Sequence, residues 1–212
     1  MNVEIEKIGH HLAHPKGEDG IKVAEMMANS NYGMIEKSFR QLSEKDKSVL
    51  EIGFGNASHL EPLLSGHPEI TYVGVEQSET MIRFARELWK NTPYYKFIRS
   101  EDFAVDQWQE AFDAVVSVNT LYFQENPKSF VENFYPVIQD NGSFILTFAD
   151  KEFMAKVPFV NELFTLYSLG DVKIIFEDTI FAKTEYHTFN EILTSPDGEQ
   201  FGRDFHVVCF YK

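Results

Sequence analysis

The sequence predicts an α/β fold with a doubly wound, largely parallel sheet, and three observations support it. From Val49 onward, short apolar strands alternate with amphipathic helices, which is typical of strand–helix–strand units. No repeat, low-complexity tract or linker rich in Pro, Gly and Ser interrupts the 212 residues. Apolar residues make up 43% of the chain and aromatic residues 15%, a globular composition. We therefore expect one continuous domain over residues 1–212.

Five strands are expected where short apolar runs end at turn residues or acids. Their predicted ranges are residues 48–52, 71–76, 94–98, 112–118 and 143–148. The helices between them have start signals. A capping box from Ser58 to Glu61 predicts the first, although Pro62 disturbs its register, Ser78 caps the second, and Asn126 before a proline begins a third.

Two regions lie outside this alternation. Residues 1–47 have apolar residues at helical spacing and predict an extension of one or two helices. Residues 153–167 read as a helix interrupted near Pro158, and extended segments are expected at 172–176, 180–189 and 205–211. Consecutive strands without a helix between them predict an antiparallel edge of the sheet. The domain then divides into an extension over 1–47, an alternating half over 48–150 and a C-terminal half over 151–212.

Charge and composition restrict the partners. Asp and Glu number 33 against 19 Lys and Arg, giving a net charge of −14. This field opposes binding to phosphate backbones and anionic membranes, so we expect no nucleic-acid partner. No apolar run approaches the roughly 20 residues that span a membrane, and the N-terminus lacks a signal-peptide pattern. The single cysteine, Cys209, excludes an intrachain disulfide. A cytoplasmic protein is expected.

A ligand crevice is predicted where the first two strands end. Gly53 and Gly55 follow the first strand, and glycines let a backbone approach a ligand closely. Glu76 ends the second strand, where an acid meets a ribose diol in doubly wound sheets. A dinucleotide site requires a third glycine where this chain has Ser58. The pattern therefore favours a nucleoside ligand of another kind.

At residues 51–56, Glu-Ile-Gly-Phe-Gly-Asn, the chain resembles the first motif of class I S-adenosylmethionine-dependent methyltransferases. The resemblance continues through residues 73–76, 100–102, 112–123 and 142–146. The chain is similar to the branch of this family that includes small-molecule and quinone methyltransferases. The resemblance implies a Rossmann-like, seven-stranded mixed sheet with an antiparallel C-terminal strand. It also implies S-adenosyl-L-methionine as cofactor and a small-molecule acceptor.

The same resemblance implies which residues bind the cofactor. The glycines pass under its methionine and ribose parts, Glu51 organises their loop near the ammonium group, and Glu76 accepts both ribose hydroxyls. Glu101 is expected to face the adenine amino group. The full expected set is Glu51, Gly53, Gly55, Asn56, Glu76, Gln77, Glu101, Asp102, Asn119 and Thr120.

Methyl transfer needs an aligned acceptor, and some acceptors also need a general base. The sequence offers four candidates for a base, none of which its position singles out: Tyr122, Glu185, His187 and His206. Three N-terminal histidines, His10, His11 and His14, suggest a metal site only weakly, because Pro15 ends any helix there and no further ligand follows. We expect no metal.

The N-terminal segment over residues 17–31 looks like a helix that closes over the cofactor in some relatives. A helix packed on the sheet edge explains the pattern equally well. Deleting residues 1–31 is expected to leave a folded protein with weakened cofactor binding. The apolar segment over 153–167 is expected to roof an acceptor pocket.

Three alternative functions stay open from the sequence: a non-catalytic S-adenosylmethionine-binding protein, a nicotinamide-dependent reductase and an aminopropyl transferase.

Overall fold

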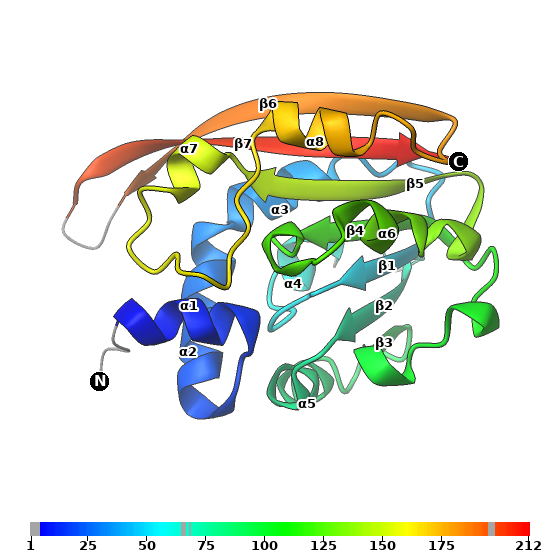
Figure 1. Cartoon of the computed structure of the whole chain (residues 1–212). Helices are drawn as coiled ribbons and strands as arrows, with labels where there is room; N and C mark the ends of the chain where they lie inside the picture. The colour runs from blue at the N-terminus through cyan, green and yellow to red at the C-terminus, as the bar shows by residue number, and fades with distance from the viewer. Residues whose placement is uncertain (1–4, 65–66, 68, 195–197) are drawn as a thin grey trace.

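The computed structural model describes residues 5–64, 67, 69–194 and 198–212 (Figure 1). Its described part holds a seven-stranded sheet with the order β3-β2-β1-β4-β5-β7-β6. The strands are β1 (Ser48–Ile52), β2 (Thr71–Glu76), β3 (Tyr95–Arg99), β4 (Phe112–Val118), β5 (Ile138–Ala149), β6 (Lys183–Thr194) and β7 (Gln200–Tyr211). β1 to β5 pair in parallel, whereas β7 is antiparallel to both β5 and β6. The predicted fold class is confirmed.

Strand order reverses beside β1, because β1 pairs with β2 on one side and with β4 on the other. The connection from β1 leads to β2 on one side of β1, and the connection from β3 returns to β4 on its other side. A crevice therefore opens at its carboxyl end, where doubly wound sheets bind ligands. Val49 pairs with Tyr72 and with Ala114, so the ends of the three strands lie level. The loops after them meet at one edge of the sheet.

Eight α-helices flank the described sheet. They are α1 (Ile5–Ala13), α2 (Gly17–Ser30), α3 (Tyr32–Phe39), α4 (Leu60–Leu64), α5 (Glu79–Leu88), α6 (Pro127–Glu132), α7 (Lys151–Met154) and α8 (Leu169–Ile175). Figure 1 shows α1 and α2 beside the carboxyl ends of β1 and β2. Over its described residues, 5–47, the extension thus has three helices where the spacing predicted one or two.

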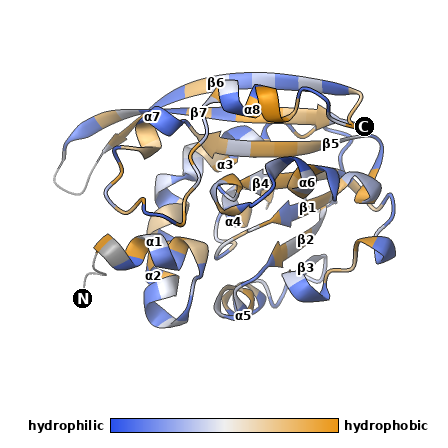
Figure 2. Cartoon of the chain, viewed as in Figure 1, coloured by the Kyte–Doolittle hydropathy of each residue, from blue (hydrophilic) through white to orange (hydrophobic). Residues whose placement is uncertain are grey.

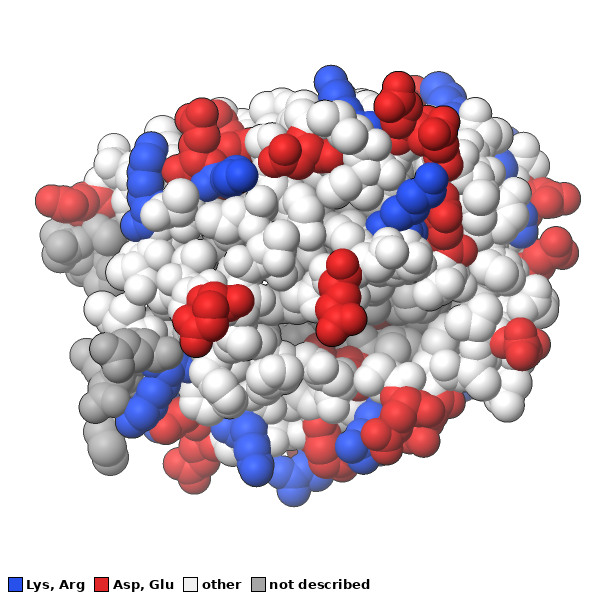
Figure 3. Space-filling view, viewed as in Figure 1, with Lys and Arg blue, Asp and Glu red and all other residues white. Residues whose placement is uncertain are grey.

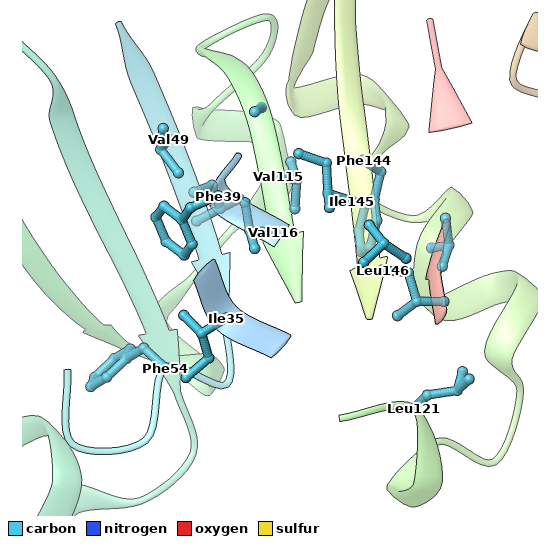
Figure 4. Packing of buried hydrophobic residues seen from close by; sticks show 14 of the residues in the cluster. Ile35, Phe39, Val49, Phe54, Val115, Val116, Leu121, Phe144, Ile145 and Leu146 are labelled. Atoms are coloured by element: carbon cyan, nitrogen blue, oxygen red, sulfur yellow. The ribbon is translucent and has the colours of Figure 1, made fainter. Parts of the chain in front are cut away.

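The core lies between the central strands and the helices against them. From α3, Ile35 and Phe39 pack toward Val49 of β1 and Val116 of β4 (Figure 4). Burial of such side chains contributes roughly 1.5–3 kcal/mol each. Figure 2 shows apolar residues along β5 and β7, while the edge strand β6 alternates in hydropathy. The sheet centre is therefore buried, and the loops at its carboxyl edge are left to form a site.

Two sequence predictions near the C-terminus are wrong. Residues 172–176 form most of helix α8 and the residue after it, not a strand, because Ser168 and Asp171 form a capping box at its start. The long helix expected over residues 153–167 reduces to α7, which ends before Pro158. The chain then runs without regular structure to Ser168, as expected where proline removes a backbone donor.

Helix starts elsewhere were predicted with mixed success. Ser78 accepts the Met81 amide, and Asn126 accepts the Ser129 amide, as predicted. Ser58 does not cap α4. Instead, Asn56 Oδ1 accepts the Ser58 amide at 3.1 Å and its hydroxyl at 2.9 Å, which forms a local turn. The helix begins two residues later, at Leu60.

Candidate cofactor and acceptor site

One cavity of about 2170 Å³ lies at the carboxyl edge of the sheet. The loops after β1, β2, β4 and β5 form its floor. Helices α1 and α2, the segment 149–164 and the outer half of the β6–β7 hairpin surround it. Figure 3 shows a hollow in the centre of this face, with acidic side chains on both sides of it. The predicted crevice therefore belongs to a larger space that extends beyond the cofactor loops.

The glycine loop after β1 is shaped for close approach of a ligand. Gly53 has φ +77° and Gly55 φ +61°, conformations that favour glycine. A Cβ on Gly53 would collide with Cγ2 of Thr120, whereas no atom lies within 4 Å of a Cβ placed on Gly55. The backbone of Gly55 thus borders open space in the cavity.

Asn56 adds a free donor to this loop. Its side chain is 3% exposed, and its amide nitrogen Nδ2 has no hydrogen-bond partner. A buried amide without a partner costs about 1–3 kcal/mol. Asn56 lines the cavity, so a polar ligand that accepts from Nδ2 would remove this cost.

Glu76 lies at the end of β2 with a carboxylate that is 7% exposed. Oε1 accepts the amides of Gln77 at 2.9 Å and Ser78 at 3.0 Å, and Oε2 accepts the Gly55 amide at 3.4 Å. Burial raises the pKa of Glu76, although these backbone donors oppose the shift. Because Oε2 has one long hydrogen bond, it retains capacity for ligand hydroxyls.

Glu51 is buried below the glycine loop rather than exposed at its surface. Its Oε2 accepts the Tyr72 hydroxyl at 2.6 Å and lies 2.9 Å from His59 Nε2. Burial and the nearby Glu51 raise the pKa of Tyr72 well above its usual value. Glu51 also lines the cavity, so its position fits the expected role of organising the loop.

The structure does not bring Glu101 or Asp102 to the cavity. They lie on a 3₁₀ turn after β3 that turns both side chains toward solvent, and Glu101 pairs with Arg99 at 3.0 Å. Ser100 and Phe103, on either side of these acids, line the cavity instead. An adenine contact at this place would thus involve Ser100 and Phe103.

The loop after β4 places Asn119 and Thr120 in the cavity wall, as expected. Asn119 has φ +57°, and its amide donates to Thr147 O at 2.8 Å. Tyr122 follows, with a hydroxyl that accepts the Ala149 amide at 2.7 Å and lies 3.0 Å from Asn119 Oδ1. Burial raises the pKa of Tyr122. This hydroxyl joins the turn after β4 to the end of β5 and is poorly suited to act as a base.

The other three candidate bases lie outside the cavity lining. Glu185 accepts the Tyr211 hydroxyl and pairs with Lys183, which lowers the pKa of Glu185. His187 neighbours it on β6. His206 is 5% exposed and reaches the cavity only indirectly, through Asp150. None of the three contacts the cavity directly.

Asp150 and Arg203 are two charged residues of the cavity wall that the sequence analysis did not name. Asp150 follows β5 directly, and an acid at the carboxyl end of a parallel strand was the signal that could have identified it. Arg203 is 3% exposed and joins Glu191 to the end of α2, donating to Ser30 O at 2.7 Å and to Asn31 Oδ1 at 2.8 Å. The pairing of β6 with β7 places Arg203 in the cavity wall.

The turn between α1 and α2 rests on the residues that follow Glu76. Gln77 Nε2 donates to Ala13 O, and the Ser78 hydroxyl donates to Pro15 O, each at 2.5 Å. The Gly17 amide donates to Thr80 Oγ1 at 3.2 Å. The N-terminal helices therefore border the crevice and are attached to the residues after β2.

No group of three or more His, Cys, Asp or Glu residues is placed to hold a metal ion within the described part of the chain. His10 and His14 contact each other through their rings, with centroids 5.6 Å apart. Likewise, none of the described helices combines the length and apolarity needed to cross a membrane.

Comparisons with known proteins agree with this geometry. Residues 50–146 match the model of the family described as methyltransferase domain. A tRNA (guanine-N(7)-)-methyltransferase of Mycoplasmopsis agalactiae is 31% identical over 99 residues. That match covers 45% of this chain and 45% of the relative, so it spans under half the length of either protein.

Solved structures share the fold at low identity. A SAM-dependent methyltransferase of Thermotoga maritima, described as a possible histamine N-methyltransferase, has a TM-score of 0.64 at 18% identity, covering 97% of this chain and 99% of its own. A chain from the complex of the Haloferax volcanii Trm112 methyltransferase activator with a methyltransferase has a TM-score of 0.65 at 16% identity, covering 99% of both.

The fold is shared with solved SAM-dependent methyltransferases, and the glycine loop and the acid after β2 both lie within residues 50–146. Because residues 50–146 match the methyltransferase domain model, S-adenosylmethionine is the molecule to test against this crevice. The crevice fits that molecule. Gly55 offers open backbone, Asn56 a buried donor without a partner, and Glu76 a buried carboxylate with spare capacity.

Proposed function

We propose that this protein is an S-adenosylmethionine-dependent methyltransferase and that it acts on a small molecule that binds in the outer part of the cavity. The observation that carries the proposal is the continuity and size of the space. At about 2170 Å³ the cavity is larger than the roughly 300–1,000 Å³ of common ligand pockets. It has room for the methyl donor and a small acceptor side by side.

In the inner part, we assign the donor to the loops after β1, β2 and β4. Glu76 accepts the ribose hydroxyls, Gly53 and Gly55 lie beneath the ligand, and Asn119 with Thr120 borders its methionine end. The bound donor supplies an electrophilic methyl group on a sulfonium. The protein then has to orient an acceptor and exclude water.

In the outer part, aromatic side chains form the walls for an acceptor. Phe123 and Phe164 pack with ring centroids 4.8 Å apart. Phe153 of α7 stacks on Phe201 of β7, with centroids 6.1 Å apart. All four line the cavity. Such walls suit the apolar body of a small molecule and exclude water from it.

A tRNA acceptor is the second candidate, favoured by the 31% identity to a tRNA methyltransferase over 99 residues. The net charge of −14 opposes this alternative, because nucleic-acid binding relies on cations that neutralise phosphates. The carboxylates around the cavity oppose it for the same reason. The small-molecule acceptor is therefore the better supported proposal.

Transfer of a labelled methyl group separates the two candidates. The enzyme is incubated with methyl-labelled S-adenosylmethionine and, separately, with a cell extract of small metabolites, total tRNA or total protein. The proposal predicts label in the metabolite fraction and S-adenosylhomocysteine release only there. Label in tRNA or protein alone would contradict it. The variant Glu76→Gln is the control for enzyme-dependent transfer.

A further inference from the structure

We propose that the acceptor is an amine on an apolar, aromatic-sized body, and that Asp150 is the residue that selects it. The inference rests on the proposed function, because it names the class of molecule that enters the outer part of the same cavity. It depends on the placement of Asp150, the charge of the cavity wall and the apolar surfaces around it.

The backbone holds Asp150 firmly at the edge of the cavity. Asp150 directly follows β5, and its amide donates to Asp204 O at 2.9 Å. The preceding residue, Ala149, donates its amide to the buried Tyr122 hydroxyl. Because β5 is central and parallel to β4, Asp150 and Asn119 emerge at the same edge of the sheet. Asp150 thus lies near the loop assigned to the methionine end of the donor.

Two protein groups hold the carboxylate of Asp150, and its oxygens can accept further hydrogen bonds. Oδ1 accepts the Glu152 amide at 2.8 Å, and Oδ2 lies 3.0 Å from His206 Nε2. His206 is in turn fixed by Thr188 Oγ1, 3.0 Å from its Nδ1. A carboxylate can accept about four hydrogen bonds, and these contacts use two. The side chain is 17% exposed and lines the cavity, so the remaining capacity serves a ligand there.

The charge of the wall favours a cation. Among the described lining residues, seven carry carboxylates and two, Lys156 and Arg203, carry a positive charge. Arg203 is already bonded to Glu191, Ser30 and Asn31. A cleft lined mainly by one sign of charge concentrates ligands of the opposite sign and repels anions. An ammonium group is therefore favoured over a carboxylate or phosphate.

The surfaces around Asp150 accommodate an apolar body. Phe153, three residues after Asp150 on α7, stacks on Phe201 and has the Arg203 guanidinium over its ring, 5.8 Å from the centroid, so it contributes apolar surface to the wall. At the rim, four large apolar side chains of the lining are exposed: Met26 by 42%, Leu163 by 37%, Ile192 by 61% and Phe201 by 41%. Exposed apolar groups clustered at an opening mark a binding surface.

The chemistry of an amine acceptor is compatible with this placement. An ammonium nitrogen accepts a methyl group only after losing a proton, since its lone pair is otherwise engaged. The carboxylate that holds the ammonium accepts that proton on an Asp150 oxygen. The nitrogen–methyl bond then forms as the sulfonium–methyl bond breaks, and S-adenosylhomocysteine is the leaving group.

Three probes with the same ring and different head groups test the inference: 2-phenylethylamine, 2-phenylethanol and 3-phenylpropionate. Each is titrated by calorimetry into the full-length protein saturated with S-adenosylhomocysteine. We expect the amine to bind at least about tenfold more tightly than the alcohol, and the carboxylate most weakly, because only the amine makes a charge-assisted hydrogen bond.

The variant Asp150→Asn is expected to reduce amine affinity about tenfold, to that of the alcohol, while alcohol affinity stays unchanged. Asparagine also caps helices well, so α7 should persist. Glu125→Gln is the matched control, since it removes an exposed carboxylate of the same wall, and it should change amine affinity less than twofold. If Asp150→Asn unfolds, His206→Gln serves instead and should weaken the amine selectively.

Equal affinity for amine and alcohol, tighter binding of the carboxylate, or an amine preference that survives Asp150→Asn would overturn the inference. So would the absence of amine binding at millimolar concentration. Binding of S-adenosylhomocysteine is measured first in every variant, and label transfer is measured separately. Loss of donor binding or of transfer counts against the proposed function, whereas loss of head-group preference alone counts against Asp150.

Discussion

Replacing Glu76 by Gln tests the assignment of the ribose site, because it keeps the shape of the side chain and removes its charge. Two ribose hydroxyls then donate to a neutral group. A hydrogen bond to a charged group contributes about 1.5–3 kcal/mol and a neutral one about 0.5–1.5 kcal/mol, so each bond loses about 1 kcal/mol. A total of about 2 kcal/mol corresponds to a Kd for S-adenosylhomocysteine about 30-fold higher.

Isothermal titration calorimetry measures this Kd directly. Glu101→Gln is the matched control, because Glu101 also follows a strand of this sheet but its side chain is 62% exposed and outside the cavity. It should change the Kd less than twofold. A Glu76→Gln protein that binds within twofold of the original, or a Glu101→Gln protein that loses binding, would refute the assignment.

The pH dependence of binding gives a second measure at Glu76. Burial raises the pKa of its carboxyl, and the ribose hydroxyls donate to the ionised form. Affinity should therefore fall as pH decreases toward the raised pKa, above the value of about 4.3 of an ordinary glutamate. Without ligand the sign is reversed: the folded state holds more protons, so stability should decline as pH rises from the ordinary to the raised pKa. Glu76→Gln should remove both effects.

Three further predictions concern the frame of the site. Tyr122→Phe leaves the buried Ala149 amide without its acceptor and should lower the free energy of unfolding in urea by about 1–3 kcal/mol. Gly53→Ala places a Cβ against Thr120 at a positive φ, and should weaken S-adenosylhomocysteine binding in calorimetry at least about tenfold. Removal of residues 1–16 takes away the partners of Gln77 and Ser78, and should raise the same Kd while circular dichroism stays that of a folded protein.

Each of these has a control in the chain. Tyr94→Phe alters a side chain that is 59% exposed and should leave stability unchanged. Gly170→Ala meets no atom closer than 3.6 Å and should leave binding unchanged. The truncation keeps Ser30 and Asn31, the partners of Arg203, so a loss of folding would contradict the view that residues 1–16 only cover the crevice.

The sequence predicted the parallel half of the sheet well, because its signals are local. The runs over 48–52, 71–76 and 112–118 are apolar and end in glycines, an acid or a polar turn, and the strands have these bounds. The strand predicted over 172–176 was wrong, since a short apolar run fits a buried strand as well as a helix face. The capping box that begins at Ser168 stabilises a helix instead, and Ser168 lies outside the apolar run.

The residues of the site also differ in whether their signals are local in the sequence. Gly53, Gly55 and Glu76 were predictable because each follows a strand whose end is visible in the sequence. The acids after β3 were misplaced, because a single 3₁₀ turn decides whether they or Ser100 and Phe103 face the cavity. The acceptor side depends on contacts across long stretches of chain. Asp150 meets His206 only through the pairing of β5 with β7, 56 residues apart.

A crystal structure of the full chain with bound S-adenosylhomocysteine would locate the donor site directly. Both ribose hydroxyls are expected within hydrogen-bonding distance of Glu76, and the sulfur beside Asn119, facing the aromatic part of the cavity. A ribose held by another acid, or a sulfur directed away from that part of the cavity, would contradict this assignment.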